Sequence, residues 1–229
     1  MFKFLEKGRL PARWRPRLIS LGLAALGVAV FLEILFKVAR DPGARQLDEN
    51  ILIRLAEFRR PWLNGMAIDV TALGSVSLMA LLSLVTLSIL AMTRDRIGML
   101  QLFVSVAGGA LWGQLAKALV HRDRPTVVPH LVQAYGSSFP SGHSLSITTT
   151  YLALAFLCCR HFPRFRDRLT LFLLSFLIIG LVGLSRMYLG VHYASDVVSG
   201  ICVGAAWALL VAAAASFLDT ELPNPNPNP

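Results

Sequence analysis

Long apolar runs alternate with short polar segments along the chain, and this alternation predicts membrane-spanning helices. A helix needs about 20 mostly apolar residues to cross the hydrocarbon core of a bilayer. Six runs of about this length are present: Leu18–Phe36, Leu73–Met92, Ile97–Ala116, Ser141–Cys159, Leu169–Leu189 and Val197–Phe217. The pattern therefore predicts an all-α fold, an integral membrane bundle of six transmembrane helices.

The segment 38–70, between the first two runs, carries a second helical pattern. Its start, Asp41-Pro42-Gly43, is typical of a turn. Apolar residues then recur at helical spacing, at Leu47, Ile51, Leu55 and Phe58. We expect a short amphipathic helix here. Two placements fit the spacing equally well: on the outer bilayer surface, or packed over the outer end of the bundle.

The two ends of the chain lead to separate expectations. A basic segment precedes the first apolar run, as in a secretory signal, but the run is too long and no small-residue cleavage motif follows it. We therefore expect a retained anchor helix. At the other end, prolines alternate with asparagines from Pro223 to Pro229, which prevents a regular helix. We expect one six-span domain over residues 1–222 and a disordered tail over 223–229.

Composition supports the membrane assignment and narrows the partners. Of 229 residues, 55% are hydrophobic and only 15% are charged, against roughly 25% charged in soluble domains; the mean hydropathy is +0.61. The net charge of +9 could suit nucleic acid, but the basic residues lie in short segments between apolar runs and no nucleic-acid-binding motif is present. The three cysteines have neither disulfide nor metal-site spacing. We expect a bilayer as partner and no nucleic acid.

The distribution of basic residues predicts the orientation. Lys and Arg are enriched in the cytoplasmic loops of membrane proteins. With both termini inside, twelve basic residues are cytoplasmic: Lys3, Lys7, Arg9, Arg13, Arg15, Arg17, Arg94, Arg96, Arg160, Arg164, Arg166 and Arg168. The other ten lie outside, and three of these, Lys117, Arg124 and Arg186, are expected to have a different role. We expect both termini to be cytoplasmic.

In this orientation three polar clusters fall on the outer face. They are Lys117–Pro125 after the third run, Pro140–His143 at the start of the fourth, and Ser185–Asp196 between the fifth and sixth. Ionisable groups at membrane depth are costly and mark a functional site by default. The three clusters are therefore expected to form one site.

The cations of these clusters predict an anion site. Lys117 and Arg124 are seven residues apart and share a helix face if the helix persists that far. Pro125 disfavours helical geometry at Arg124, which could then turn towards a neighbouring helix end. Arg186 adds a third cation. Three converging cations need an anion between them, and the arginine fork suits phosphate oxygens.

The Pro140-Ser141-Gly142-His143 stretch has the features of a helix start that binds an anion. Proline is favoured in the first turn, where its missing N–H costs nothing. The N–H groups of Ser141, Gly142 and His143 would then point at the anion from the positive end of the helix dipole. Gly142 lets a ligand approach the backbone closely, and the Ser141 hydroxyl can donate one more hydrogen bond.

The two histidines of the clusters suit opposite roles. His192 and Asp196 are four residues apart and lie on one face if both are helical. The aspartate can accept from one imidazole nitrogen and leave the other as a base or nucleophile. His143, close to an anion, is favoured in its protonated form. Each feature alone also fits a plain turn, a packed histidine or topological anchors, but their order and shared membrane face together indicate phosphoryl transfer.

The chain resembles the type 2 phosphatidic acid phosphatase superfamily. The family pattern K-x6-R-P, P-S-G-H and S-R-x5-H-x3-D is complete here, without departure, as Lys117…Arg124-Pro125, Pro140–His143 and Ser185-Arg186…His192…Asp196. The resemblance implies that His192 attacks phosphorus to form a phosphohistidine, that Asp196 orients it, and that His143 protonates the leaving oxygen. It implies that the phosphoryl oxygens are held by Lys117, Arg124, Ser141, Gly142 and Arg186. It also implies no metal and no cofactor.

The resemblance further implies a lipid phosphate substrate and a bacterial plasma (inner) membrane, with the site on the outer, periplasmic face. Family members act on phosphatidylglycerol phosphate, phosphatidic acid, undecaprenyl diphosphate and lipid A phosphates. A phosphotransferase that passes the group to a lipid or sugar acceptor is an alternative. An anion or lipid transporter is disfavoured, because transporter sites lie at the bilayer midplane. The headgroup and the oligomeric state stay open.

Two residues inside the first motif's spacer have no assigned role. His121 and Arg122 could hold a second phosphate, or could simply meet water and lipid headgroups.

Overall fold

The computed structural model describes residues 14–221, and within this range the chain forms eight helices and no strand. The expected tail at 223–229 and the first thirteen residues lie outside the described residues. Six stretches are long and apolar enough to span a membrane, which confirms the predicted all-α, six-span class. The helices are α1 (Trp14–Arg40), α2 (Pro42–Glu57), α3 (Pro61–Ala72), α4 (Val76–Met92), α5 (Arg96–Leu119), α6 (Gly142–Cys159), α7 (Phe165–Tyr188) and α8 (Ala194–Glu221).

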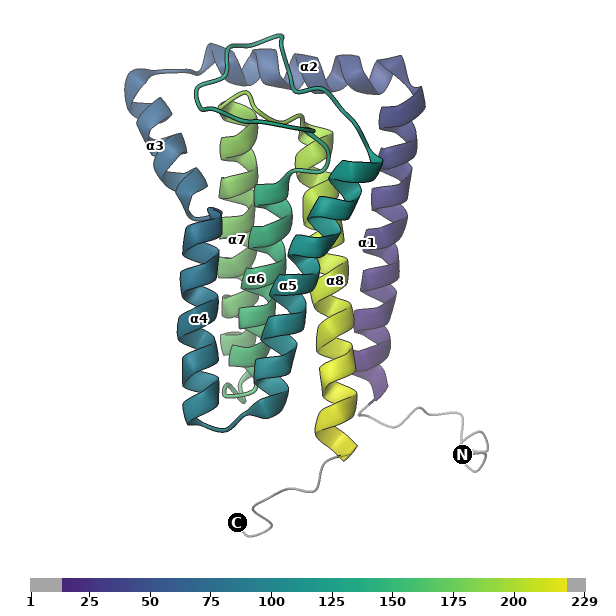
Figure 1. Cartoon of the computed structure of the whole chain (residues 1–229), viewed down its shortest axis with the longest axis vertical. Coiled ribbons are helices and arrows are strands. Elements are labelled where there is room, and N and C mark those ends of the chain that lie inside the picture. Colours follow the sequence, from purple (N-terminus) through teal and green to yellow (C-terminus); the bar gives the residue numbers. More distant parts are fainter. Residues whose placement is uncertain (1–13, 222–229) are drawn as a thin grey trace.

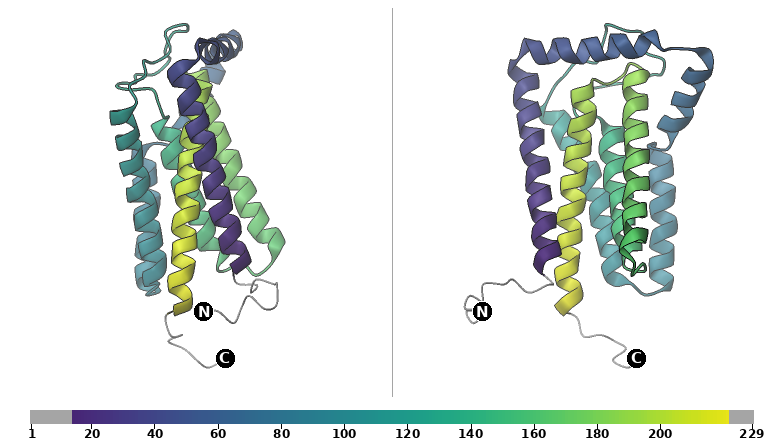
Figure 2. Two further views of the ribbon diagram at one scale, coloured as in Figure 1. Left: turned by 90° about the vertical axis from the view of Figure 1, so that its right-hand side faces the viewer. Right: turned by 180° about the vertical axis from the view of Figure 1, so that it is seen from behind.

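The spanning helices run side by side, and α2 lies across one end of the bundle (Figures 1 and 2). We call this end the site end; it also carries the loop 120–141 and the turn 189–193. The other end, called the opposite end, carries the turns 93–95 and 160–164. The start of α1 and the end of α8 meet there, where the rings of Trp14 and Phe217 are 5.5 Å apart.

The second span differs from its prediction. Helical structure begins at Pro61 and is interrupted at residues 73–75, so that α3 leans away from the axis of α4 (Figure 1). Ser75 caps α4, because its Oγ accepts a hydrogen bond from Leu78 N at 3.3 Å. In the break, a Cβ on Gly74 would lie only 2.9 Å from Val182 Cγ1. The break therefore lets this span pack closely against α7.

Helix α2 confirms that a short helix follows the turn at residue 41, and its buried residues show how it packs. Asp41 caps it, with its Oδ1 accepting from Gly43 N at 2.8 Å. The face turned to the bundle carries Asp48 and Leu52, which are 4% and 1% exposed. Leu47 and Phe58, predicted on the apolar face, are 64% and 65% exposed. The helix thus packs over the bundle end with a different face from the predicted one, and its contact with the bilayer surface stays a prediction.

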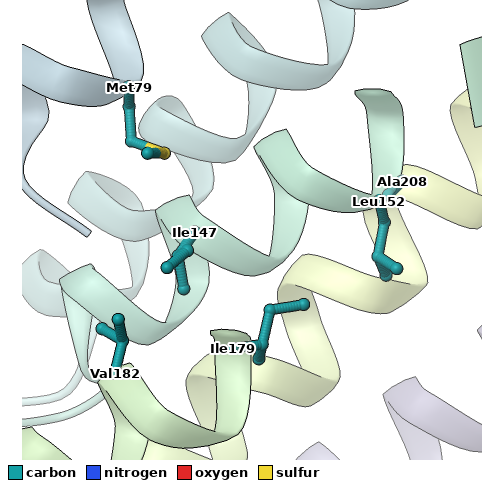
Figure 3. Close-up of a cluster of buried hydrophobic side chains, with 6 residues drawn as sticks. All are labelled: Met79, Ile147, Leu152, Ile179, Val182 and Ala208. Atoms are coloured by element: carbon teal, nitrogen blue, oxygen red, sulfur yellow. The ribbon is translucent and has the colours of Figure 1, made fainter. Parts of the chain in front are cut away.

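Helix α6 lies at the centre of the bundle, against α5, α7 and α8. Around it a fully apolar cluster joins four helices, formed by Met79, Ile147, Leu152, Ile179, Val182 and Ala208 (Figure 3). Two glycines of α8 bring that helix against α6: a Cβ on Gly200 would lie 2.6 Å from Ser141 O, and one on Gly204 would lie 2.7 Å from Leu145 O. This close approach places the first turns of α6 and α8 next to each other.

Candidate active site

The three polar clusters meet at the site end through backbone hydrogen bonds. The loop 120–141 is closed on itself by Ser138 N donating to Arg122 O at 2.9 Å. It joins the turn 189–193 through Leu131 N donating to Leu189 O at 3.0 Å. Residues from three separate parts of the sequence therefore form one rim, as their patterns predict.

Helix α6 begins at Gly142, so Pro140 is not in its first turn as predicted. Pro140 precedes the helix, and Ser141 is the N-cap, its Oγ accepting from Ser144 N at 3.4 Å. The predicted anion-facing N–H of Ser141 is instead engaged, because it donates to Asp196 O at 3.0 Å. This bond ties the start of α6 to the first turn of α8. The backbone donors that remain for an anion begin at Gly142.

Lys117 and Arg124 do not share a helix face, because α5 ends at Leu119. Lys117 nevertheless reaches the start of α6, where a Cβ on Gly142 would lie 3.3 Å from its Nζ. The predicted proximity of Lys117 and Gly142 therefore arises from packing between α5 and α6.

Arg124 lies in the loop and braces it. Its guanidinium donates to three backbone carbonyls, those of Val191 at 2.8 Å, Tyr135 at 2.8 Å and Gly136 at 3.1 Å. The same group has its Nη1 3.4 Å from His192 Nε2. Burial lowers the pKa of Arg124 below its usual value. Arg124 therefore joins the loop to the turn that carries His192.

Arg186, in the last turn of α7, is 6% exposed and only partly satisfied. Its Nη1 donates to Thr71 Oγ1 at 3.1 Å, and its buried Nε has no hydrogen-bond partner among the described residues. Lys117 lies against Gly142 at the start of α6, and Arg124 and Arg186 lie at the same end of the bundle. The three cations thus converge around the start of α6, where an anion would neutralise them.

His192 lies before α8 and not on it, so the predicted shared helix face with Asp196 is wrong. A turn with Gly190 at φ +80°, a conformation that favours glycine, leads the chain from α7 to His192. The imidazole is 2% exposed. Its Nδ1 is 3.6 Å from Asp196 Oδ2, beyond hydrogen-bond distance, and has no other partner among the described residues. The pair meets through the turn, with Nε2 directed to Arg124.

The environment of His192 favours the neutral imidazole. Burial lowers its pKa to about 4 from the usual 6.5; Arg186 and Arg124 add to the effect and Asp196 opposes it. A neutral imidazole has a lone pair for attack at neutral pH. The residue is thus held in the state that a nucleophile requires.

Two charged residues that the sequence did not assign complete the site. Arg122 donates through Nη1 to Asp196 Oδ1 at 2.5 Å and through Nη2 to Asp48 Oδ2 at 2.8 Å. Arg122 thus faces a carboxylate on each side. The motif spacer drew attention to Arg122, but nothing in the spacing linked it to Asp48, on another helix.

The described residues contain no group of three or more His, Cys, Asp or Glu side chains placed to hold a metal ion. Carboxylates at the site, Asp48 and Asp196, are both engaged with Arg122. The arrangement offers cations and backbone donors for an anion, together with two histidines for proton and group transfer.

Comparisons with known proteins find relatives and a solved structure that are similar to this chain. Phosphatidylglycerophosphatase B of Bacillus subtilis (strain 168) is 31% identical over 177 residues, covering 76% of this chain and 86% of the relative. Lipid A 1-phosphatase of Rhizobium etli is 32% identical over 121 residues, covering 48% of this chain and 47% of that protein. The crystal structure of a transmembrane PAP2-type phosphatidylglycerolphosphate phosphatase from Bacillus subtilis superposes with a TM-score of 0.76 at 28% identity, over 87% of this chain and 98% of that one.

These relatives are phosphatases, and the chain shares with the solved one a multi-pass helical membrane fold. The profile of the PAP2 superfamily matches residues 98–218, which is more than half of the sequence and includes all three motifs. The chain therefore belongs to the PAP2 superfamily.

Proposed function

We propose that the protein is a lipid phosphatase of a bacterial plasma membrane that hydrolyses a lipid phosphomonoester or diphosphate through a phosphohistidine. One observation carries the proposal. His192 is buried and lies between Asp196 on one ring nitrogen and Arg124 on the other, at the bundle end that also carries Lys117 and Arg186, and burial lowers its pKa to about 4. A nucleophile, its orienting group and an anion site are thereby combined.

In the first step His192 Nε2 attacks phosphorus while the bond between phosphorus and the lipid oxygen breaks. His143, in the first turn of α6, gives a proton to the departing oxygen. The ring of His192 then carries positive charge, which the carboxylate of Asp196 stabilises. The 3.6 Å separation of Nδ1 and Oδ2 closes to a hydrogen bond at this stage, since catalytic contacts are often long without substrate.

In the second step a water molecule attacks the phosphohistidine. His143 accepts its proton, the bond between phosphorus and Nε2 breaks, and inorganic phosphate leaves. Both histidines then have their starting protonation state. Lys117, Arg124 and Arg186 bind the equatorial oxygens in both steps, with Gly142 and Ser141 at the start of α6.

We infer that the reaction needs no metal ion, because these cations neutralise the charge that a metal would neutralise in phosphoryl transfer. Activity should survive an excess of EDTA. Loss of activity on chelation that magnesium restores would overturn this part of the mechanism.

The substrate class follows from the position of the site. Lys117 and Arg186 lie near the ends of α5 and α7, and Arg124 lies in the loop 120–141 that follows α5. We expect this end of the bundle to lie at the depth of lipid headgroups, where a lipid already carries its phosphate. The relatives named above are phosphatases of phosphatidylglycerol phosphate and of lipid A. Phosphatidylglycerol phosphate, phosphatidic acid and undecaprenyl diphosphate are the candidates for this chain.

We further infer that the site end faces the periplasm. The eight basic residues of the predicted cytoplasmic set that are described belong to the start of α1 and to the turns and helix starts of the opposite end: Arg15, Arg17, Arg94, Arg96, Arg160, Arg164, Arg166 and Arg168. The positive-inside rule then makes the opposite end cytoplasmic. A cysteine at Gln133, in the loop 120–141, should react with a membrane-impermeant thiol reagent in intact cells; labelling only after lysis would invert this orientation.

The decisive experiment is phosphate release by the purified protein in mixed micelles, with a series of lipid phosphates of fixed headgroup and decreasing chain length. Binding energy from the chains holds the phosphate for attack, so kcat/KM should fall at least about tenfold, roughly 1.4 kcal/mol, for a soluble short-chain analogue. A flat series would remove the lipid assignment. Product that depends on an added acceptor would indicate a phosphotransferase, and lipid or anion movement without phosphate release a transporter.

A further inference from the structure

We propose that Asp48, on α2, is a positioning residue that holds Arg122, and through it Asp196 and His192, in the geometry needed for attack. The inference rests on the proposed function, because it assigns a task to a residue that acts on the proposed nucleophile. Asp48 lies outside residues 98–218, which the family profile matches. It belongs to the helix that crosses the site end (Figure 1).

Both carboxylate oxygens of Asp48 are engaged, and all of their partners are site residues. Oδ2 accepts from Arg122 Nη2 at 2.8 Å and from Ser195 Oγ at 2.5 Å. Oδ1 accepts from Ser195 N at 3.0 Å. The residue is 4% exposed, so these contacts replace water almost completely. A buried carboxylate of this kind is costly unless it is paired and hydrogen-bonded.

Arg122 is held in one orientation by this carboxylate and by three further contacts. Its Nη1 donates to Ser195 Oγ at 2.7 Å and to Asp196 Oδ1 at 2.5 Å. Its guanidinium also lies over the ring of Tyr193, 4.1 Å from the centroid. Asp48 holds the end of the guanidinium that points away from Asp196. Without that ion pair, Arg122 is free to tilt and to pull the Asp196 carboxylate with it.

The orientation of Asp196 matters because its two oxygens have different tasks. Oδ1 is occupied by Arg122, whereas Oδ2 accepts from Tyr193 N at 2.9 Å and faces His192 Nδ1 at 3.6 Å. A small rotation of this carboxylate moves Oδ2 away from the imidazole. Misplacement of a group by about 1 Å can cost about a hundredfold in rate. The charges alternate in sign from Asp48 through Arg122 to Asp196, so each group keeps its neighbour in place.

Asp48 also stabilises the start of α8. Ser195 N belongs to the first turn of this helix, where backbone donors lack intrahelical acceptors and negative charge is favourable. A carboxylate from another helix supplies the missing acceptor. The first turn of α8 carries Asp196, so this contact fixes the backbone of Asp196 as well as its side chain.

The test is Asp48→Asn, which keeps the size of the side chain and removes its charge. We expect kcat to fall about tenfold or more, with KM within about twofold of the wild type, because the phosphate-binding cations are unchanged and only attack is impaired. Rapid-quench measurement should show slower phosphoenzyme formation. An unchanged kcat would overturn the proposal.

Two controls on the same helix separate positioning from folding. Glu49→Gln removes a neighbouring carboxylate, which pairs with Arg45 on the same helix, and should leave kcat unchanged. Leu52→Ala removes a buried side chain that packs with Val128 and Tyr193, so it should lower thermal stability without the loss of kcat. If Leu52→Ala reduces kcat as much as Asp48→Asn at equal stability, a merely structural role explains Asp48 and the proposal fails.

A double-mutant cycle tests whether Asp48 acts through Arg122. If it does, Asp48→Asn combined with Arg122→Gln should have the kcat of Arg122→Gln alone, and additive losses would contradict the relay. His192→Ala, assayed in parallel, keeps the two levels apart. Activity that survives in His192→Ala would overturn the proposed nucleophile. If His192→Ala is inactive but Asp48→Asn has the kcat of the wild type, only the positioning role is overturned.

Discussion

The two ends of the bundle each carry an arginine that pairs with an aspartate on another element, at very different depths. At the site end Arg122 lies between Asp48 and Asp196, with side-chain exposures of 12%, 5% and 0%. At the opposite end Arg160 pairs with Asp95 at 3.3 Å, with exposures of 28% and 30%. Arg160 also donates to Gln101 Oε1 at 2.7 Å. The chemistry of the pairs is alike, and their burial is not.

The difference in depth separates a functional network from a structural one. An accessible pair such as Arg160–Asp95 costs little to form and contributes little, about 0–1 kcal/mol. Burial of an arginine between two carboxylates carries a desolvation penalty that an apolar cluster would avoid. The opposite end has such a cluster, formed by Leu90, Leu102, Ala153 and Leu157. Burial of the charges at the site end, next to His192, therefore fits a need for geometry more than for stability.

Removal of the His192 imidazole should have the largest effect at the site end. His192→Ala should abolish the phosphoenzyme and lower kcat by at least about 10⁴-fold, because a nucleophile acts as a unit with its partners. The measurement is trapping of labelled phosphoenzyme after acid-free quenching, together with steady-state rates. Retention of labelled protein in this variant would place the nucleophile elsewhere.

A smaller effect is expected for the other histidine, and it depends on the substrate. His143→Ala should lower kcat by about 10²–10⁴-fold for an alkyl phosphate, whose leaving oxygen needs a proton. The loss should be much smaller for an activated aryl phosphate, which leaves without one. Parallel assays of both substrates provide the check, and equal losses would contradict the acid role.

Replacing Arg122 and Arg160 in the same way tests whether burial separates the roles of the two ion pairs. Arg122→Gln leaves two buried carboxylates unpaired, so it should cost about 3–5 kcal/mol of stability and lower kcat by about 100-fold through misplacement of Asp196. Arg160→Gln should cost at most about 1 kcal/mol and leave kcat unchanged. Thermal unfolding and steady-state kinetics of both purified variants decide the matter. Similar losses in the two variants would show that depth does not separate their roles.

The smallest effect concerns acid pH. Because the pKa of His192 is lowered to about 4 in the folded protein, kcat/KM should show no loss from this residue as pH falls through 6.5, and should decline only towards 4. Stability should behave differently: the unfolded chain binds a proton at His192 near pH 6.5 and the folded chain does not, so the free energy of unfolding falls as pH decreases from 6.5 towards 4. The contrary result is a fall in kcat/KM with an apparent pKa near 6.5 that persists when each of the other histidines is replaced. That fall would have to come from His192 and would contradict a lowered pKa for this residue.

Much of the fold could be predicted because hydrophobic length is a local property of the sequence. The six spans follow directly from apolar runs. The interruption of the second span did not, because residues 61–72 are as compatible with a surface segment as with a tilted helix. Its position depends on Gly74 packing against Val182 of α7, a contact between segments distant in sequence.

The composition of the site was predictable and its local geometry was not. Motif spacing brought Lys117, Arg186 and His192 to one end of the bundle, as the structure shows. The predicted shared helix faces required α5 to continue to Arg124 and α8 to include His192. In the structure α5 ends before Arg124 and α8 begins after His192. The role of Asp48 could not be predicted from the sequence, because only tertiary packing of α2 over the bundle brings it to Arg122.

The separation of the site from both described chain ends has a directional consequence. The start of α1 and the end of α8 lie at the opposite end of the bundle from the turn that carries His192 (Figure 1). In the proposed reaction, phosphate released at the site end enters the compartment opposite to the one that the start of α1 and the end of α8 face. The reverse reaction, in which inorganic phosphate would react with the lipid alcohol, would depend only on the phosphate concentration in that compartment. In that arrangement, a kinase on the other side of the bilayer can phosphorylate lipid without exposure to the phosphate that the site releases.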